Sequence, residues 1–165
     1  MRTGAVGFEA ARALALALPL LLMAGALGSE HFGGLYPCEM CIWQRKPHYA
    51  AIALAALAFV VPDGAARILV ALAGIAILVS GGIGVFHAGV EYGWWQGVTA
   101  CSSTVAAGAG GDIDALLDRI MKAPLIRCDV AQWKLLGISL AGFNALFSLA
   151  GGLAVLLLLS RKQVA

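Results

Sequence analysis

The chain alternates four long apolar stretches with shorter polar segments. A helix that crosses about 30 Å of hydrocarbon needs roughly 20 residues, so the length of each stretch decides whether it spans a membrane. The third and fourth stretches are long enough by themselves, and the first is long enough if Arg12 extends its charged end to the interface. The stretches run from about Ala13 to Gly28, Tyr49 to Val61, Ile68 to about Phe86, and about Leu135 to Leu159.

The second stretch is too short to span a membrane as it stands. From Tyr49 to Val61 a helix would rise only about 20 Å at ~1.5 Å per residue. We therefore expect the helix to begin earlier, near Cys41 or Ile42, which places Arg45 at the membrane interface.

These lengths predict an all-α fold, an integral membrane four-helix bundle that forms one domain over residues 1–165. The four spans are expected at about residues 10–28, 42–61, 67–87 and 136–159, with loops on the opposite face from the termini at about 29–41 and 88–135.

Two further segments bear on this topology. The N-terminus resembles a secretory signal, with Arg2 and Arg12 ahead of an apolar run, but three more spans follow, so we expect it to be retained as the first span. In the second loop, a glycine-rich joint precedes a predicted short amphipathic helix from Asp112 to about Lys122. This helix would either lie flat on the bilayer or pack against the protein itself.

The composition excludes several classes of protein. Apolar residues make up 61% of the 165 residues and charged residues only 12%, which is too apolar for a soluble globule of this length. A formal net charge of +2 is also too small to indicate nucleic-acid binding. The predicted surroundings of the chain are therefore a lipid bilayer, with no nucleic-acid partner.

Charge and cysteine distribution together predict the orientation. Four spans place both termini on one face, and all four cysteines lie on the other. Basic residues are no rarer on the cysteine face, but on the terminal face they are concentrated in two short tails and one turn, which marks the cytoplasmic side. Disulfides persist outside the cytosol. We therefore expect cytoplasmic termini and cysteine loops on the side of the membrane outside the cytosol.

The cysteines carry the candidate chemistry. Cys38 and Cys41 form a CxxC motif at the expected start of the second span, where free backbone N–H groups and the helix dipole stabilise a thiolate. Arg45 is four residues beyond Cys41, so in a regular helix its guanidinium would lie on the same face. Pro47 weakens this inference, because it removes a helical hydrogen bond and permits a kink.

The second pair, Cys101 and Cys128, lies in the long loop. A disulfide between these two would close a loop worth about 3 kcal/mol of chain entropy, and so would serve as a simple staple. Four cysteines allow three pairings, and spacing does not rank them. A redox function would use more than one pairing in turn, because thiolate attack on a disulfide is reversible. His87, at the end of the third span, either bonds at the interface or belongs to the site.

Two motifs resemble the DsbB family of bacterial inner-membrane disulfide-forming proteins. The first is CEMCIWQR, residues 38–45, and the second comprises RCD at 127–129 with GISLAGFN at 137–144. The order of spans and cysteine pairs also matches the family over nearly the whole chain. Departures are small: Met40 stands where Leu is common, and Phe143 where Trp is expected.

The resemblance implies a route for electrons. A reduced DsbA-like thioredoxin-fold protein of the periplasm would attack the outer pair, with Cys101 as the expected site of the mixed disulfide. Cys128 and Cys38 would bridge transiently, and electrons would reach the Cys38–Cys41 pair. The Cys41 thiolate would then add to, or form a charge-transfer pair with, a quinone from the membrane pool. The quinone would be ubiquinone or menaquinone.

The same resemblance assigns Cys38, Cys41, Cys101 and Cys128 as catalytic residues of a protein-disulfide:quinone oxidoreductase. Around the quinone we expect Cys41, Arg45 and His87, and no metal site. The vitamin K epoxide reductase-like family pairs similar chemistry with a similar bundle, but there the CxxC follows the loop cysteines. Three other classes fit less well: a metal-binding or transport protein, a haem protein, and a structural protein with two static disulfides.

Overall fold

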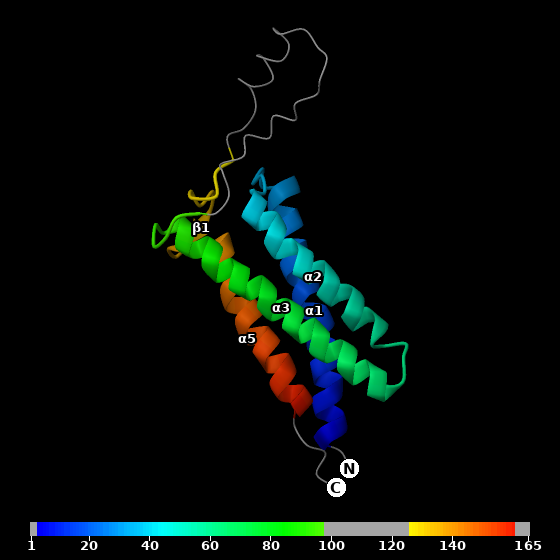
Figure 1. Ribbon diagram of the computed structural model, residues 1–165. Helices are drawn as coiled ribbons and strands as arrows, with labels where there is room; N and C mark the ends of the chain where they lie inside the picture. The colour runs from blue at the N-terminus through cyan, green and yellow to red at the C-terminus, as the bar shows by residue number, and fades with distance from the viewer. Residues whose placement is uncertain (1–2, 98–125, 161–165) are drawn as a thin grey trace, which may run out of the picture.

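The computed structural model describes residues 3–97 and 126–160, and these form an elongated bundle of helices (Figure 1). A short hairpin of β1 (Lys134–Leu135) and β2 (Ile138–Ser139) precedes the last helix. The helices of the described residues are α1 (Thr3–His31), α2 (Glu39–Leu57), α3 (Asp63–Glu91) and α5 (Leu140–Ser160).

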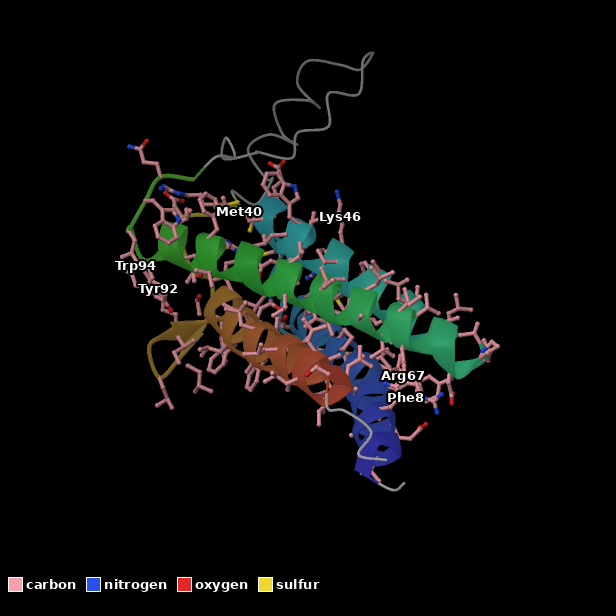
Figure 2. All side chains as sticks on the ribbon, turned by 60° about the horizontal axis from the view of Figure 1, so that its bottom comes forward. Phe8, Met40, Lys46, Arg67, Tyr92 and Trp94 are labelled. Atoms are coloured by element: carbon pink, nitrogen blue, oxygen red, sulfur yellow. The ribbon has the colours of Figure 1, made fainter. Side chains whose placement is uncertain are left out.

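The arrangement agrees with the predicted all-α class. α3 packs against α2 on one side and α5 on the other, and α1 contacts both α5 and α2. The start of α1 and the end of α5 lie at the same end of the bundle (Figure 1). Phe8 and Arg67 mark this end in Figure 2, and Met40 and Tyr92 lie at the opposite end. The cation–π contact between Arg67 and Phe8, 4.6 Å from guanidinium carbon to ring centre, joins α1 to α3.

Among the described residues, three helices are long and apolar enough to cross a membrane: Val6–His31 of α1, all of α3, and all of α5. The second expected span is also a helix, but α2 has only 19 residues and carries three charged residues in its first two turns. It ends at Leu57 instead of residue 61, because a turn and Pro62 lead directly into α3. A membrane crossing by α2, and with it the four-span bundle, stays a prediction.

Other element boundaries differ from expectation. α1 and α3 each run several residues past the expected spans at both ends. The fourth span was expected from residue 136, but Leu136 and Gly137 form the two-residue turn of the hairpin, with φ of 52° and 81°. α5 therefore begins only at Leu140. The predicted amphipathic helix from Asp112 to Lys122 lies outside the described residues.

Small residues bring α3 and α5 close together. A Cβ atom added at Gly84 would lie 3.0 Å from the backbone nitrogen of Ala145, and one at Gly152 would lie 3.1 Å from the carbonyl oxygen of Gly74. Ser80 and Ser148 are fully buried in the same interface. Interfaces of this kind are typical of membrane helices, which associate by close packing and interhelical hydrogen bonds.

Candidate functional site

The CxxC motif begins α2. Cys38 is the N-cap residue, and its Sγ accepts a hydrogen bond from the backbone N–H of Cys41 at 3.3 Å. Its thiol also donates to the Sγ of Cys41, 3.0 Å away. The helix start is two residues earlier than the Cys41 predicted from sequence, because Cys38 itself supplies the cap. Both sulfurs consequently lie at the positive end of the helix dipole, where a thiolate is stabilised.

The two thiols differ in acidity. The hydrogen bond from Cys38 lowers the pKa of Cys41, although burial acts in the opposite direction. Sharing that proton, together with burial, raises the pKa of Cys38 to about 12. Both residues precede residue 42, the expected start of the second span. In the reduced pair, Cys41 is therefore the more acidic thiol, and Cys38 keeps its proton to higher pH.

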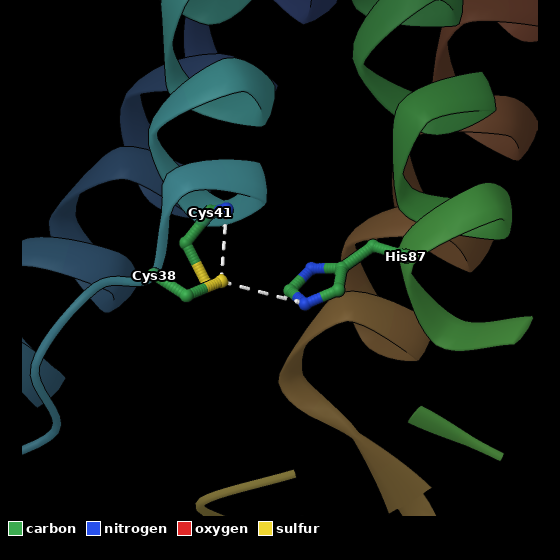
Figure 3. A group of neighbouring side chains, drawn as sticks. All are labelled: Cys38, Cys41 and His87. Carbon is green, nitrogen blue, oxygen red and sulfur yellow. Dashed lines mark hydrogen bonds between the residues drawn. The ribbon is translucent and has the colours of Figure 1, made fainter. Parts of the chain in front are cut away.

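His87 of α3 faces this pair. Its Nε2 lies 3.5 Å from the Sγ of Cys38, as Figure 3 shows. Its Nδ1 lies 2.7 Å from the side-chain nitrogen of Gln44, which also donates to the carbonyl oxygen of Met40. Because an amide nitrogen only donates, Nδ1 of His87 is the acceptor, and the ring proton is on Nε2. This proton points at the CxxC sulfur.

A buried network of hydrogen bonds fixes the side chain of Gln44. The side-chain oxygen of Gln44 accepts from Nδ2 of Asn144 at 2.8 Å, and Oδ1 of Asn144 lies 2.9 Å from Nε2 of His48. Ser80 donates to the carbonyl oxygen of Gln44 at 2.8 Å, and Ser148 donates to Asn144 at 3.0 Å. The network links α2, α3 and α5, so the orientation of His87 depends on all three helices.

Arg45 lies beside the site, but its guanidinium is bound to another helix. Nη1 is 2.5 Å from a carboxylate oxygen of Glu30, and Nη2 donates to the carbonyl oxygen of Ala26 at 3.4 Å. Both partners belong to α1. Among the described residues, the hydrogen bonds and the ion pair of Arg45 run to α1, and none joins it to Cys41. Helical spacing did not reveal this pairing, because Glu30 is 15 residues away in sequence.

Cys128 packs onto the CxxC motif. It is buried in one cluster with Cys38, Met40 and Val90, against which Cys41 and Trp43 also pack. Four residues after Cys128, the side chain of Gln132 donates to the carbonyl oxygen of Tyr36 at 2.6 Å. This hydrogen bond joins the segment before α2 to the segment before β1. Cys101, the fourth predicted site residue, lies outside the described residues.

A cavity of about 230 Å³ opens beside these groups. Most of its wall is apolar and comes from α1, α5, residues 35–37 before α2, and residues that follow Cys128. The polar part of the wall contains Cys38, Cys41, Arg45, His48, His87 and Asn144. Every site residue predicted from sequence that the structure describes, apart from Cys128, therefore lines one space.

Three site residues escaped the sequence prediction. Gln44 is three residues after Cys41 and four before His48, so helical spacing places it on the same face as both and could have indicated it. Glu91 is four residues after His87; its side chain is 7% exposed, and one carboxylate oxygen lies 3.8 Å from Nε2 of His87. Asn144 was visible only as a polar residue within an apolar span.

The sequence was compared with known proteins. The family model described as "Disulfide bond formation protein DsbB" matches residues 9–158. Disulfide bond formation protein B of Acinetobacter baylyi is 31% identical over 154 residues, covering 86% of this chain and 85% of the relative.

Two further relatives were found. The protein of the same name from Acinetobacter baumannii is 33% identical over 125 residues, covering 72% of this chain and 71% of the relative. An uncharacterised protein of Rickettsia prowazekii is 25% identical over 134 residues, covering 81% of this chain and 77% of the relative. No solved structure gave a significant match. On the family match and these identities, the chain belongs to the DsbB family of disulfide bond formation proteins, which are membrane disulfide oxidoreductases.

Proposed function

We propose that this protein reoxidises a periplasmic DsbA-like protein and passes the electrons to a membrane quinone. The observation that carries this proposal is the position of the Cys38–Cys41 pair. Its thiolate-forming sulfur lines an apolar cavity, and Cys128 packs against the same motif. A lipid-soluble acceptor can use such a cavity, and a loop cysteine can exchange with such a dithiol.

The proposed thiol steps conserve atoms and electrons. The partner's thiolate breaks the Cys101–Cys128 disulfide and forms a mixed disulfide at Cys101, which releases Cys128 as a thiolate. The partner's second thiol then displaces Cys101 and leaves as a disulfide. Cys128 attacks Cys38 of the oxidised CxxC, Cys101 closes onto Cys128, and the Cys38–Cys41 dithiol remains. Two electrons and two protons have then moved from the partner to the CxxC.

The cavity wall suits a quinone headgroup. Its apolar residues would hold the ring, and Arg45 and His87 provide N–H donors for the carbonyl oxygens. A quinone supplies the capacity to accept the two electrons and two protons of the dithiol. Within this site, Cys41 presents the thiolate, and the Nε2–H of His87 faces the Cys38 sulfur. Ubiquinone and menaquinone both have the required carbonyl oxygens.

This function requires a specific location. The helices that suit a bilayer and the family membership support an inner-membrane protein. We place both termini in the cytoplasm and the cysteine loops in the periplasm, where the DsbA-like partner resides.

The test is a coupled assay with purified protein. Reduced DsbA-like partner and a soluble ubiquinone or menaquinone analogue are mixed with the protein in detergent, and loss of quinone absorbance is followed. We expect one quinone reduced for each partner disulfide formed, and no reaction with Cys41→Ala. The variant His31→Ala, at an exposed position, is the matched control and should keep full activity. Quinone reduction by Cys41→Ala, or partner oxidation that never consumes quinone, would overturn the proposal.

A further inference from the structure

Three potential metal ligands of the described residues converge at the reduced CxxC motif, and a fourth lies close by. The ligand atoms of Cys38, Cys41 and His87 all lie within 4.8 Å of one another (Figure 3). Cys38 and His87 are buried, and Cys41 is partly buried. Glu91 adds a carboxylate one helical turn beyond His87, and it lines the same cavity. One of its oxygens, Oε2, is buried and has no hydrogen-bond partner in the described structure.

The distances suit a tetrahedral ion. With bonds of about 2.3 Å to sulfur and 2.0–2.1 Å to nitrogen or oxygen, tetrahedral ligand atoms lie roughly 3.3–3.8 Å apart. Nε2 of His87 is 3.5 Å from the Cys38 sulfur and 3.8 Å from Oε1 of Glu91. The two sulfurs, 3.0 Å apart, are closer than this range because a proton joins them. Replacing that proton by an ion requires only a small opening of the pair.

The charge of the site also favours a cation. The carboxyl group of Glu91 is only 7% exposed, and burying its Oε2 without a hydrogen-bond partner is costly. Two guanidinium groups line the cavity, and each has an ion pair elsewhere: Arg45 with Glu30, and Arg127 with Asp129. Two thiolates, one imidazole and one carboxylate are a donor set typical of Zn²⁺.

We propose that the reduced protein binds one divalent ion of the zinc class through Cys38, Cys41, His87 and Glu91. Binding displaces the protons left on the two thiols and moves the ring proton of His87 from Nε2 to Nδ1, so the Gln44 side chain must turn its oxygen toward Nδ1. The step requires no oxidant or reductant. The oxidised CxxC has no thiolate to offer, so the site exists only in the reduced state. A bound ion ties up the thiolate that would reduce the acceptor and the Cys38 sulfur that exchanges with Cys128. The metal would therefore stop the electron route at the reduced enzyme.

The test uses Co²⁺ as a spectroscopic substitute for Zn²⁺, with no partner or quinone present. The full chain carries Cys101→Ala and Cys128→Ala, so Cys38 and Cys41 are its remaining thiols. We expect one Co²⁺ per reduced protein, with the visible bands of a tetrahedral site and sulfur-to-cobalt charge transfer, and displacement by Zn²⁺. The oxidised protein should show none of these bands.

The variants decide which side chains bind the ion. His87→Ala and Glu91→Gln should each weaken Co²⁺ binding by about tenfold or more, whereas the exposed His31→Ala should leave it unchanged. Protection of Cys38 and Cys41 from alkylation by Zn²⁺ provides a second measurement that does not depend on spectra. Absence of binding, or binding that survives both the His87 and Glu91 substitutions, would overturn the proposal. Neither result affects the quinone assay, so the two proposals fail separately.

Discussion

Gln44 sets the protonation of His87. Its amide nitrogen is 2.7 Å from Nδ1, so the imidazole proton is held on Nε2, which faces the Cys38 sulfur at 3.5 Å. The orientation of the Gln44 side-chain amide is fixed as well, because its nitrogen donates to the Met40 carbonyl and its oxygen accepts from Asn144. The tautomer of a residue beside the redox pair thus depends on a side chain that touches neither sulfur.

We expect Gln44→Leu to destabilise the protein and to impair the site. It leaves Nδ1 of His87 without its donor and removes one of the acceptors of the Asn144 amide, at a cost of about 1–3 kcal/mol. Urea unfolding in detergent measures this cost. Leucine at Gln96, which is exposed, is the matched control and should change stability by less than about 0.5 kcal/mol. Equal effects at the two positions would mean that the network contributes nothing.

Thiol acidity should follow the Cys38–Cys41 hydrogen bond. The pKa of Cys41 is lowered first of all by that bond, so Cys38→Ala should raise it, and Cys41 should then react with alkylating reagents only at higher pH. In the reciprocal variant Cys41→Ala, the pKa of Cys38 should fall from about 12, because the shared proton and the neighbouring thiolate are gone. Alkylation rates of the reduced protein between pH 5 and 10 measure both shifts. An unchanged profile for Cys41 in Cys38→Ala would assign its acidity to the helix dipole alone.

The lowered pKa of Cys41 also makes the stability of the reduced protein depend on pH. The folded pKa of Cys41 lies below its unfolded value, so this thiol stabilises the reduced protein above the unfolded pKa. That contribution is lost as pH falls through the folded pKa. The stability of the reduced wild type relative to Cys41→Ala should therefore increase as the pH is raised from 6 to above 9.0, the ordinary pKa of the thiol. A difference that is constant across this interval would contradict the linkage.

We predict that Arg45→Ala weakens quinone-linked turnover but leaves thiol exchange with the partner nearly intact. It removes a charge-assisted donor from the cavity wall, worth about 1.5–3 kcal/mol, or roughly tenfold to a hundredfold. The KM for quinone should rise, and lysine should rescue only in part. Glu30→Gln is the informative companion, because it keeps the guanidinium and removes its ion pair. Equal loss of partner oxidation in a single turnover without quinone would make Arg45 structural.

Packing between α3 and α5 offers a paired test. Gly84→Ala places a Cβ 3.0 Å from the Ala145 nitrogen and 3.1 Å from the Ala141 oxygen, both backbone atoms, so we expect a loss of about 1–3 kcal/mol. Gly82→Ala in the same helix meets nothing within 4 Å and should be neutral or gain up to about 1 kcal/mol. Thermal unfolding in detergent compares them. A neutral Gly84→Ala would show that the helices separate without cost.

The features that could be predicted from the sequence are those that depend on residues close together in the chain. The CxxC at a helix N-terminus followed from the end of one apolar stretch and the start of the next, and the structure confirms it at Cys38. The pairing of Arg45 with Glu30 could not be predicted, because the relative rotation of α1 and α2 decides it. Gln44 and Asn144 were missed for the same reason, since they have partners on other helices. Glu91 lies one turn after His87 in the same helix, so helical spacing could have indicated it. The Leu136-Gly137 turn was hidden within an apolar run.

The hydrogen bond between Gln132 and Tyr36 has a kinetic consequence. It fixes the chain four residues after Cys128 to the chain two residues before Cys38. The distance over which the Cys128 thiol can move relative to Cys38 is therefore set by the few residues on each side of this hydrogen bond. It is not set by the length of the loop between the helices. The effective concentration of this thiol at Cys38 is that of a short tether, which for flexible linkers is in the millimolar range. In the proposed mechanism, the attack of Cys128 on Cys38 would therefore be a local, intramolecular step.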